Sequence, residues 1–67
     1  MVRQWLKDAR IHKGLTQKKV SELIEISQPS YHQIECGDNN PSVETAKKIA
    51  AVLGFDWTEF FPDEKEA

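Results

Sequence analysis

Three side chains in the segment SQPSYHQIE, residues 27–35, have the chemistry to recognise polar groups on another molecule: those of Gln28, His32 and Gln33. At about 100° per residue, a helix over this segment places Tyr31 and Ile34 on one side, with the small Ser30 at their flank. The opposite side carries Gln28, Pro29, His32 and Gln33. A glutamine amide can pair with N6 and N7 of adenine, and an apolar side chain can contact the thymine methyl group. The segment therefore has one side for packing and one for hydrogen bonding.

The ordinary alternative is that these glutamines are exposed helix residues with no ligand. The position of the segment favours the binding interpretation. A preceding helix is expected to end at Ile24, and only Glu25 and Ile26 separate it from Ser27, which can cap the next helix. Two helices joined by so short a turn form a helix-turn-helix, whose second helix is offered to the major groove of DNA.

Glycines, prolines and capping residues divide the chain into short helices, and no segment alternates like a strand. The expected N-caps are Thr16, Ser27, Ser42 and Asp56, and the expected stops are Gly14, Gly37, Gly54 and Pro62. The first helix is expected over residues 2–13. The side chains expected to face inward are Val2, Leu6, Ala9, Val20, Leu23, Ile24, Val43, Ala46, Ile49, Ala50, Leu53 and Phe60.

These elements predict an all-α fold, a compact five-helix domain over residues 1–62. The helix-turn-helix occupies residues 16–36, and residues 63–67 form an acidic tail that we expect to be frayed. A chain of 67 residues is one small domain close to the limit of independent stability, so that efficient helix packing or a partner subunit is needed.

Composition excludes several function classes. The single cysteine, Cys36, cannot form an intramolecular disulfide, and it shows no metal-site spacing with His12 or His32. We therefore expect no metal and no cofactor. No nucleophile, carboxylate pair or phosphate loop with supporting residues is present, so an enzyme is not expected.

The N-terminus is too polar for a signal peptide and no apolar run is long enough to span a membrane, which predicts a cytoplasmic protein.

Charge is distributed unevenly along the chain, although the net charge is −2. Residues 1–34 carry six lysines and arginines against three acids, whereas residues 35–67 carry three lysines against eight acids. Such asymmetry is typical of a protein with a binding surface, although lysines on exposed helices also serve solubility alone. The basic part of the chain is the part that contains the helix-turn-helix.

The segments LTQKKVSELIEISQPSYHQIECG and NPSVETAKKIAAVLGFDWTEFF closely resemble the lambdoid-phage-repressor-like (XRE-type) helix-turn-helix family. That family includes phage repressors, Cro proteins and many small bacterial regulators. The resemblance covers roughly residues 3–61 and depends on motifs that are specific only in combination. They are Gly-Leu-Thr-Gln at 14–17, Gln-Ile-Glu at 33–35, Asn-Pro-Ser at 40–42 and Ala-x-x-Leu-Gly at 50–54.

The resemblance implies roles for individual residues. Gln17 is expected to contact a DNA phosphate and to brace Gln28, and Arg10 is expected to form a structural ion pair with Glu35. The residues expected to read bases are Gln28, Pro29, His32 and Gln33. The residues expected to contact phosphates are Gln17, Lys18, Lys19, Lys13, Asn39 and Asn40. This chain departs from the family in having Glu25 where the turn usually has glycine, which predicts backbone strain there.

Few base contacts are available to one copy, so we expect a homodimer on a pseudo-palindromic operator, with half-sites about 34 Å apart. Trp57 and Phe61 are the candidate dimer contacts; alternatively, they close the core.

The function that these observations favour is a sequence-specific DNA-binding transcription regulator, expected to be a repressor. The alternative is an antitoxin-like module that neutralises a protein partner and regulates its own operon.

Overall fold

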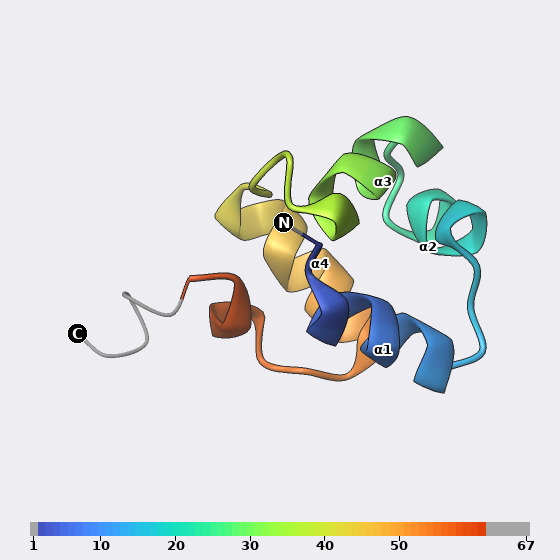
Figure 1. Ribbon diagram of the computed structural model, residues 1–67, viewed down its shortest axis with the longest axis horizontal. Coiled ribbons are helices and arrows are strands. Elements are labelled where there is room, and N and C mark those ends of the chain that lie inside the picture. The colour runs from blue at the N-terminus through green and yellow to red at the C-terminus, as the bar shows by residue number, and fades with distance from the viewer. Residues whose placement is uncertain (1, 62–67) are drawn as a thin grey trace.

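The computed structural model describes residues 2–61, in which helices joined by short turns and loops are present and no strand occurs. It contains α1 (Gln4–His12), α2 (Gln17–Leu23), α3 (Gln28–Cys36), α4 (Val43–Leu53) and the 3-10 helix η1 (Trp57–Phe60) (Figure 1). The all-α prediction is confirmed, but the fifth expected helix is a short 3-10 element. The expected end at Pro62 and the tail 63–67 lie outside the described residues.

Capping residues start the helices as expected. The side-chain oxygens of Thr16, Ser27 and Ser42 each accept a hydrogen bond from the backbone N–H three residues later, at 3.0, 3.2 and 3.2 Å. Such a bond satisfies one of the N–H groups that the first turn of a helix leaves unpaired. Gly37 and Gly54 end α3 and α4 in the left-handed conformation, with φ of 83° and 80°.

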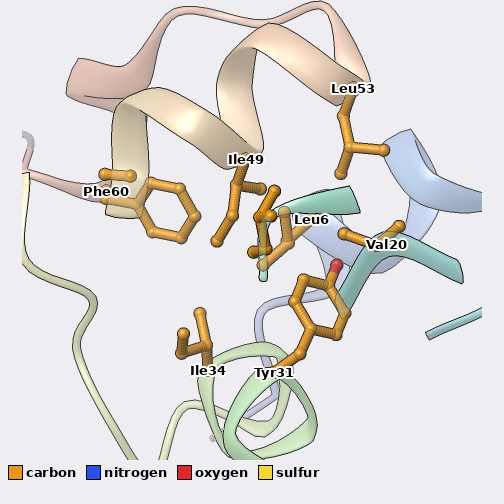
Figure 2. Close-up of a cluster of buried hydrophobic side chains, with 9 residues drawn as sticks. Leu6, Val20, Tyr31, Ile34, Ile49, Leu53 and Phe60 are labelled. Carbon is orange, nitrogen blue, oxygen red and sulfur yellow. The ribbon is translucent and has the colours of Figure 1, made fainter. Parts of the chain in front are cut away.

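One hydrophobic cluster joins all the elements (Figure 2). Its buried members are Leu6, Val20, Ile24, Tyr31, Ile34, Ala46, Ile49, Leu53 and Phe60. Tyr31 and Ile34 point from α3 into this cluster, whereas Gln28, Pro29, His32 and Gln33 are exposed. The division of α3 into a packing side and a polar side is therefore confirmed.

Three residues expected to face inward are exposed instead. Val2, Leu23 and Val43 expose 55%, 49% and 41% of their surface. Each lies at the edge of a helix: Val2 precedes α1, which begins only at Gln4, while Leu23 ends α2 and Val43 begins α4. Helical periodicity predicts which side a residue lies on, but neighbouring elements do not cover the ends of these helices.

Aromatic rings close the core beside α1 and η1. The Trp5 ring packs edge-on against Phe55 and Phe60, with centroid distances of 5.2 and 5.1 Å, and remains 38% exposed. Trp57 and Phe61 are half-buried, pack against the core cluster and contact each other at 6.0 Å. These rings therefore contribute to the core of the single chain, while part of each remains accessible.

The turn between α2 and α3 includes a residue in an unfavourable backbone conformation. Glu25 has a φ of 62°, and among residues 2–61 no other non-glycine residue has a positive φ. The left-handed region costs an L-residue roughly 1–2 kcal/mol because its Cβ crowds the backbone. The strain expected from the missing glycine is therefore present.

Glycine at this position should stabilise the domain. In Glu25→Gly, relief of the strain is partly offset by the greater freedom of glycine in the unfolded chain, so we expect a gain of up to about 1 kcal/mol. Urea denaturation measures the change. Glu22→Gly, at an exposed site inside α2, is the matched control and should destabilise by roughly 1 kcal/mol. A loss of stability in both variants would contradict this account.

A second prediction concerns the hydroxyl of Tyr31. The ring is fully buried and its hydroxyl lies near Arg10 and Glu35, but no partner among the described residues forms a hydrogen bond of ordinary geometry with it. An unpaired buried hydroxyl costs roughly 1–3 kcal/mol, so Tyr31→Phe should be neutral or stabilising in thermal unfolding. Destabilisation by more than about 1 kcal/mol would mean instead that the hydroxyl has a partner.

Candidate nucleic-acid interface

The outward side of α3 borders a hollow of about 330 Å³ that also reaches α2. Its lining residues are Gln17, Gln28, Pro29 and His32. Three of the four expected base-reading residues thus surround one surface feature, together with the first residue of α2. Pro29 lies in the first turn of α3, where its missing N–H costs no helical hydrogen bond.

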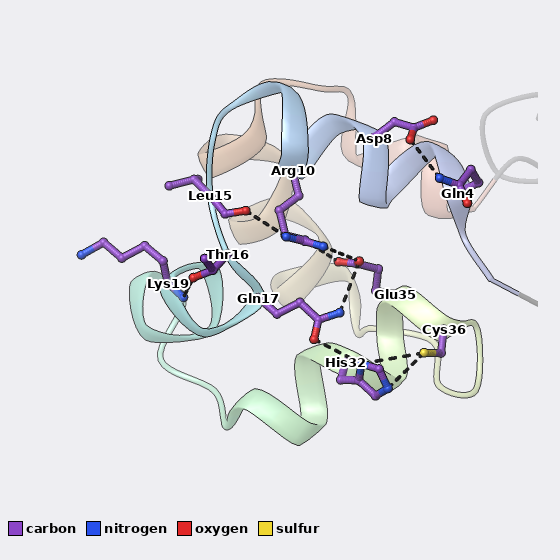
Figure 3. A network of polar contacts seen from close by, with 10 residues as sticks. All are labelled: Gln4, Asp8, Arg10, Leu15, Thr16, Gln17, Lys19, His32, Glu35 and Cys36. Atoms are coloured by element: carbon purple, nitrogen blue, oxygen red, sulfur yellow. Dashed lines mark hydrogen bonds and ion pairs between the residues drawn. The ribbon is translucent and has the colours of Figure 1, made fainter.

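A buried ion pair holds α3 against α1 (Figure 3). Arg10 donates to the Glu35 carboxylate from Nε at 2.9 Å and from Nη2 at 3.0 Å, and the two side chains are only 12% and 3% exposed. Arg10 Nη1 also donates to the backbone oxygen of Leu15 at 2.9 Å, so that the same guanidinium binds the loop before α2. One side chain of α1 therefore binds both α3 and the loop that leads into α2.

The ion pair affects the proton affinities of both groups. Burial by itself raises the pKa of Glu35, but the hydrogen bonds that the carboxylate accepts, led by those from Arg10, hold that pKa below its ordinary value. The hydrogen bond to Glu35 raises the pKa of Arg10. Glu35 is therefore an ionised carboxylate inside the protein at neutral pH.

Gln17 connects this carboxylate to the exposed side of α3 (Figure 3). Its Nε2 donates to Glu35 Oε1 at 3.3 Å, and its Oε1 lies 3.2 Å from His32 Nδ1. On the next turn of α3, Cys36 Sγ lies 3.3 Å from His32 Nε2. The resemblance implied that Gln17 braces Gln28; in the structure its side chain instead contacts Glu35 and His32.

Gln33 is held by the loop that follows α3. Asn39 Nδ2 donates to Gln33 Oε1 at 2.8 Å, and the backbone N–H of Asn39 donates to the Gln33 backbone oxygen at 3.2 Å. This bond leaves both Nε2 hydrogens of Gln33 and one lone pair of Oε1 for another molecule. The side chain of Asn39 thus orients a glutamine, and its expected contact with a phosphate stays a prediction.

Arg3, which was not assigned a role from the sequence, holds the same loop. Its guanidinium donates to the backbone oxygen of Ile34, to the backbone oxygen of Asn39 at 2.8 Å, and to Asn40 Oδ1. Its backbone N–H donates to the backbone carbonyl oxygen of Glu35 at 2.8 Å. Arg3 lies before α1, and its bonds are mostly to backbone carbonyls far along the chain. No sequence motif marks that kind of contact.

The lysines are exposed but do not all lie in the same environment. Lys18 and Lys19 are on the exposed surface of α2, and Lys19 extends away from the polar network (Figure 3). The end of the Lys13 side chain lies against Gly54, where a Cβ would be 3.3 Å from Lys13 Cε. Its charge is therefore close to the C-terminus of α4, where a cation interacts favourably with the helix dipole.

Among residues 2–61, no group of three or more His, Cys, Asp or Glu side chains is placed to hold a metal ion. None of the described helices has the length and apolar character needed to cross a membrane.

The buried ion pair predicts an acid-sensitive fold. Because the pKa of Glu35 is lower in the folded than in the unfolded chain, the pair stabilises fully above about pH 4.3, and the contribution is lost as pH falls through the folded-state pKa. Glu35→Gln should lose about 3 kcal/mol at pH 7, because it leaves Arg10 buried without its counter-ion.

Urea denaturation from about pH 7 to pH 3 checks this, and Glu35→Gln should show a shallower acid slope than the unmodified protein. The control is Glu44→Gln, which removes a carboxylate that is 83% exposed and 3.9 Å from Lys48. It should change stability by less than about 1 kcal/mol. Equal acid slopes for all three proteins would contradict the role of Glu35.

Comparison with known proteins agrees with this geometry. Residues 6–60 match the model of a family described as "Helix-turn-helix". The chain is 49% identical over 63 residues to the uncharacterised HTH-type transcriptional regulator YqaF of Bacillus subtilis (strain 168), covering 94% of this chain and 83% of that protein. It is 42% identical over 41 residues to an uncharacterised HTH-type transcriptional regulator of Haemophilus influenzae, covering 61% of this chain and 42% of that protein. The chain therefore belongs to the XRE-type helix-turn-helix family of DNA-binding transcription regulators.

Proposed function

We propose that this regulator binds a specific DNA sequence by inserting α3 into the major groove. Gln28, Pro29, His32 and Gln33 read the bases. Phosphates are contacted by Lys18, Lys19 and Gln17, by the loop at Asn39 and Asn40, and, after a movement away from α4, by Lys13. The protein acts in the compartment that holds the DNA, as a repressor that occupies its operator.

The observation that carries this proposal is the polar side of α3 held in place from inside the protein. Gln28, Pro29 and His32 surround an open hollow, and Gln33 is oriented by Asn39. These groups are exposed, while Tyr31, Ile34 and Glu35 from the same helix are buried. A helix fixed by its inner side chains presents its outer ones in one arrangement, which lowers the entropy lost on binding.

We further propose that two copies bind a pseudo-palindromic site. Each good base contact contributes about 1–3 kcal/mol, so one half-site offers limited discrimination. Trp57 and Phe61 are the candidate contacts between copies. Both rings contribute to the core of one chain but remain partly accessible, and Lys47 Nζ lies 5.2 Å from the centre of the Trp57 ring.

A second candidate function is binding to a protein partner, as an antitoxin does. The observation that favours it is an apolar hollow of about 270 Å³ between α2 and α4, beside the half-exposed Leu23. A stoichiometric partner that co-purifies with the protein, and is lost in Leu23→Lys while DNA binding remains, would support this candidate.

Selection of bound duplexes from a random pool tests the proposed reading of DNA. The recovered site should have two-fold symmetry, with half-site centres about 34 Å apart. Fluorescence anisotropy at one fixed salt concentration then compares variants on the selected duplex. Gln28→Ala and Gln33→Ala should each weaken binding by about tenfold or more, because each removes a base contact.

The matched control is Gln4→Ala, an exposed glutamine on α1 whose side chain bonds only to Asp8 at 2.9 Å in the structure. It should bind the selected duplex as the unmodified protein does. If Gln28→Ala and Gln33→Ala also bind with unchanged affinity, α3 does not read the site.

A further inference from the structure

The polar network around Glu35 includes His32, and the geometry of the network determines where the His32 proton lies (Figure 3). Gln17 bridges the two residues: one end of its amide is 3.3 Å from Glu35 Oε1 and the other end is 3.2 Å from His32 Nδ1. The direction of each bond depends on which end of the amide faces the carboxylate.

Glu35 settles that direction. Its carboxylate is paired with Arg10 at 2.9 Å and is 3% exposed, and an ionised carboxylate can only accept hydrogen bonds. The Gln17 end that faces Glu35 must therefore be the NH₂ group, which places the amide oxygen toward His32. An amide oxygen is an acceptor, so His32 Nδ1 must carry a hydrogen to form the contact.

We propose that Gln17 is a positioning residue that fixes neutral His32 as the Nδ1–H tautomer, leaving Nε2 as a hydrogen-bond acceptor at the DNA-reading surface. This inference deepens the proposed function, and its consequence for DNA rests on that function. The buried ion pair thereby determines the hydrogen-bonding character of an exposed residue through one intervening amide.

Cys36 lies beside the same ring and does not decide the tautomer. Its Sγ is 3.3 Å from Nε2 and 3.9 Å from Nδ1, so it is not in line with the lone pair of either nitrogen. The Nε2 lone pair therefore remains available to a donor on DNA.

The tautomer has a direct consequence for base choice. In the major groove, the N4 amino group of cytosine and the N6 amino group of adenine are donors, whereas O6 and N7 of guanine are acceptors. Neutral His32 with Nε2 unprotonated can pair with either amino group but not with guanine. Freed from Gln17, the ring could also present Nε2–H, which pairs with guanine.

Nitrogen-15 NMR of the free protein at about pH 8.5, where an ordinary imidazole is neutral, tests the proposal directly. Long-range proton–nitrogen correlations distinguish protonated from unprotonated ring nitrogens. His32 should show Nδ1 protonated and Nε2 unprotonated. His12, exposed at the end of α1, is the internal reference. An Nε2–H tautomer for His32 in the unmodified protein would overturn the proposal, whatever the behaviour of any variant.

Variants separate Gln17 from the other neighbours of the ring. Gln17→Leu should lose the Nδ1–H preference, whereas Cys36→Ala and the matched glutamine variant Gln4→Leu should keep it. If Gln17→Leu keeps the Nδ1–H tautomer, or if Cys36→Ala loses it, Gln17 is not the residue that sets the proton.

The DNA consequence is measured separately by selecting duplexes with Gln17→Leu. Selection with His32→Ala first identifies the base position that His32 reads, because discrimination is lost there. At that position, Gln17→Leu should raise the ratio of guanine to other bases by about tenfold relative to the unmodified protein. A lost phosphate contact would weaken all duplexes equally and leave this ratio unchanged. If the unmodified protein selects no DNA at all, the proposed function fails while the tautomer result in the free protein stands.

Discussion

The ion pair between Arg10 and Glu35 is the interaction on which the recognition surface depends. α3 is only nine residues long, too short to be stable by itself, and it places Tyr31 and Ile34 into the core. The buried carboxylate on its last turn binds Arg10 of α1, which adds a directional contact to the two apolar anchors and fixes the rotation of the helix about its axis. The polar side of α3 is therefore aimed outward by a contact on its inner side.

The same constraint extends to the side chains that we propose contact DNA. Through Gln17, the Glu35 carboxylate reaches His32 near the middle of α3. At the other end, Arg3 holds the loop that contains Asn39, and Asn39 orients Gln33. Residues with no proposed base contact thus position residues that we propose read bases. The asparagines of this loop take part in that positioning, because Asn39 donates to Gln33 and Asn40 accepts from Arg3.

Local signals predicted the helices well, because caps and stops act within one turn of the chain. The Arg10–Glu35 pair followed from family resemblance, and the apolar spacing of α3 indicated its outward side. Contacts between elements were harder to predict: the bond from Gln17 to His32 depends on how α2 packs on α3, and Arg3 binds backbone carbonyls that no residue type marks. Leu23 was placed inward because its spacing fits the apolar stripe, but the packing of α4 leaves it uncovered.

The central claim is that the outward side of α3 is the DNA-binding surface. Titrating the nitrogen-15-labelled protein with a short duplex at low salt, where even non-specific sites are occupied, tests it without knowledge of the operator. The account predicts that amide and side-chain shifts change at residues 17, 28–33 and 38–40, with little change in η1 or at the hollow beside Leu23. Changes concentrated at that hollow or in η1, with α3 unaffected, would contradict it.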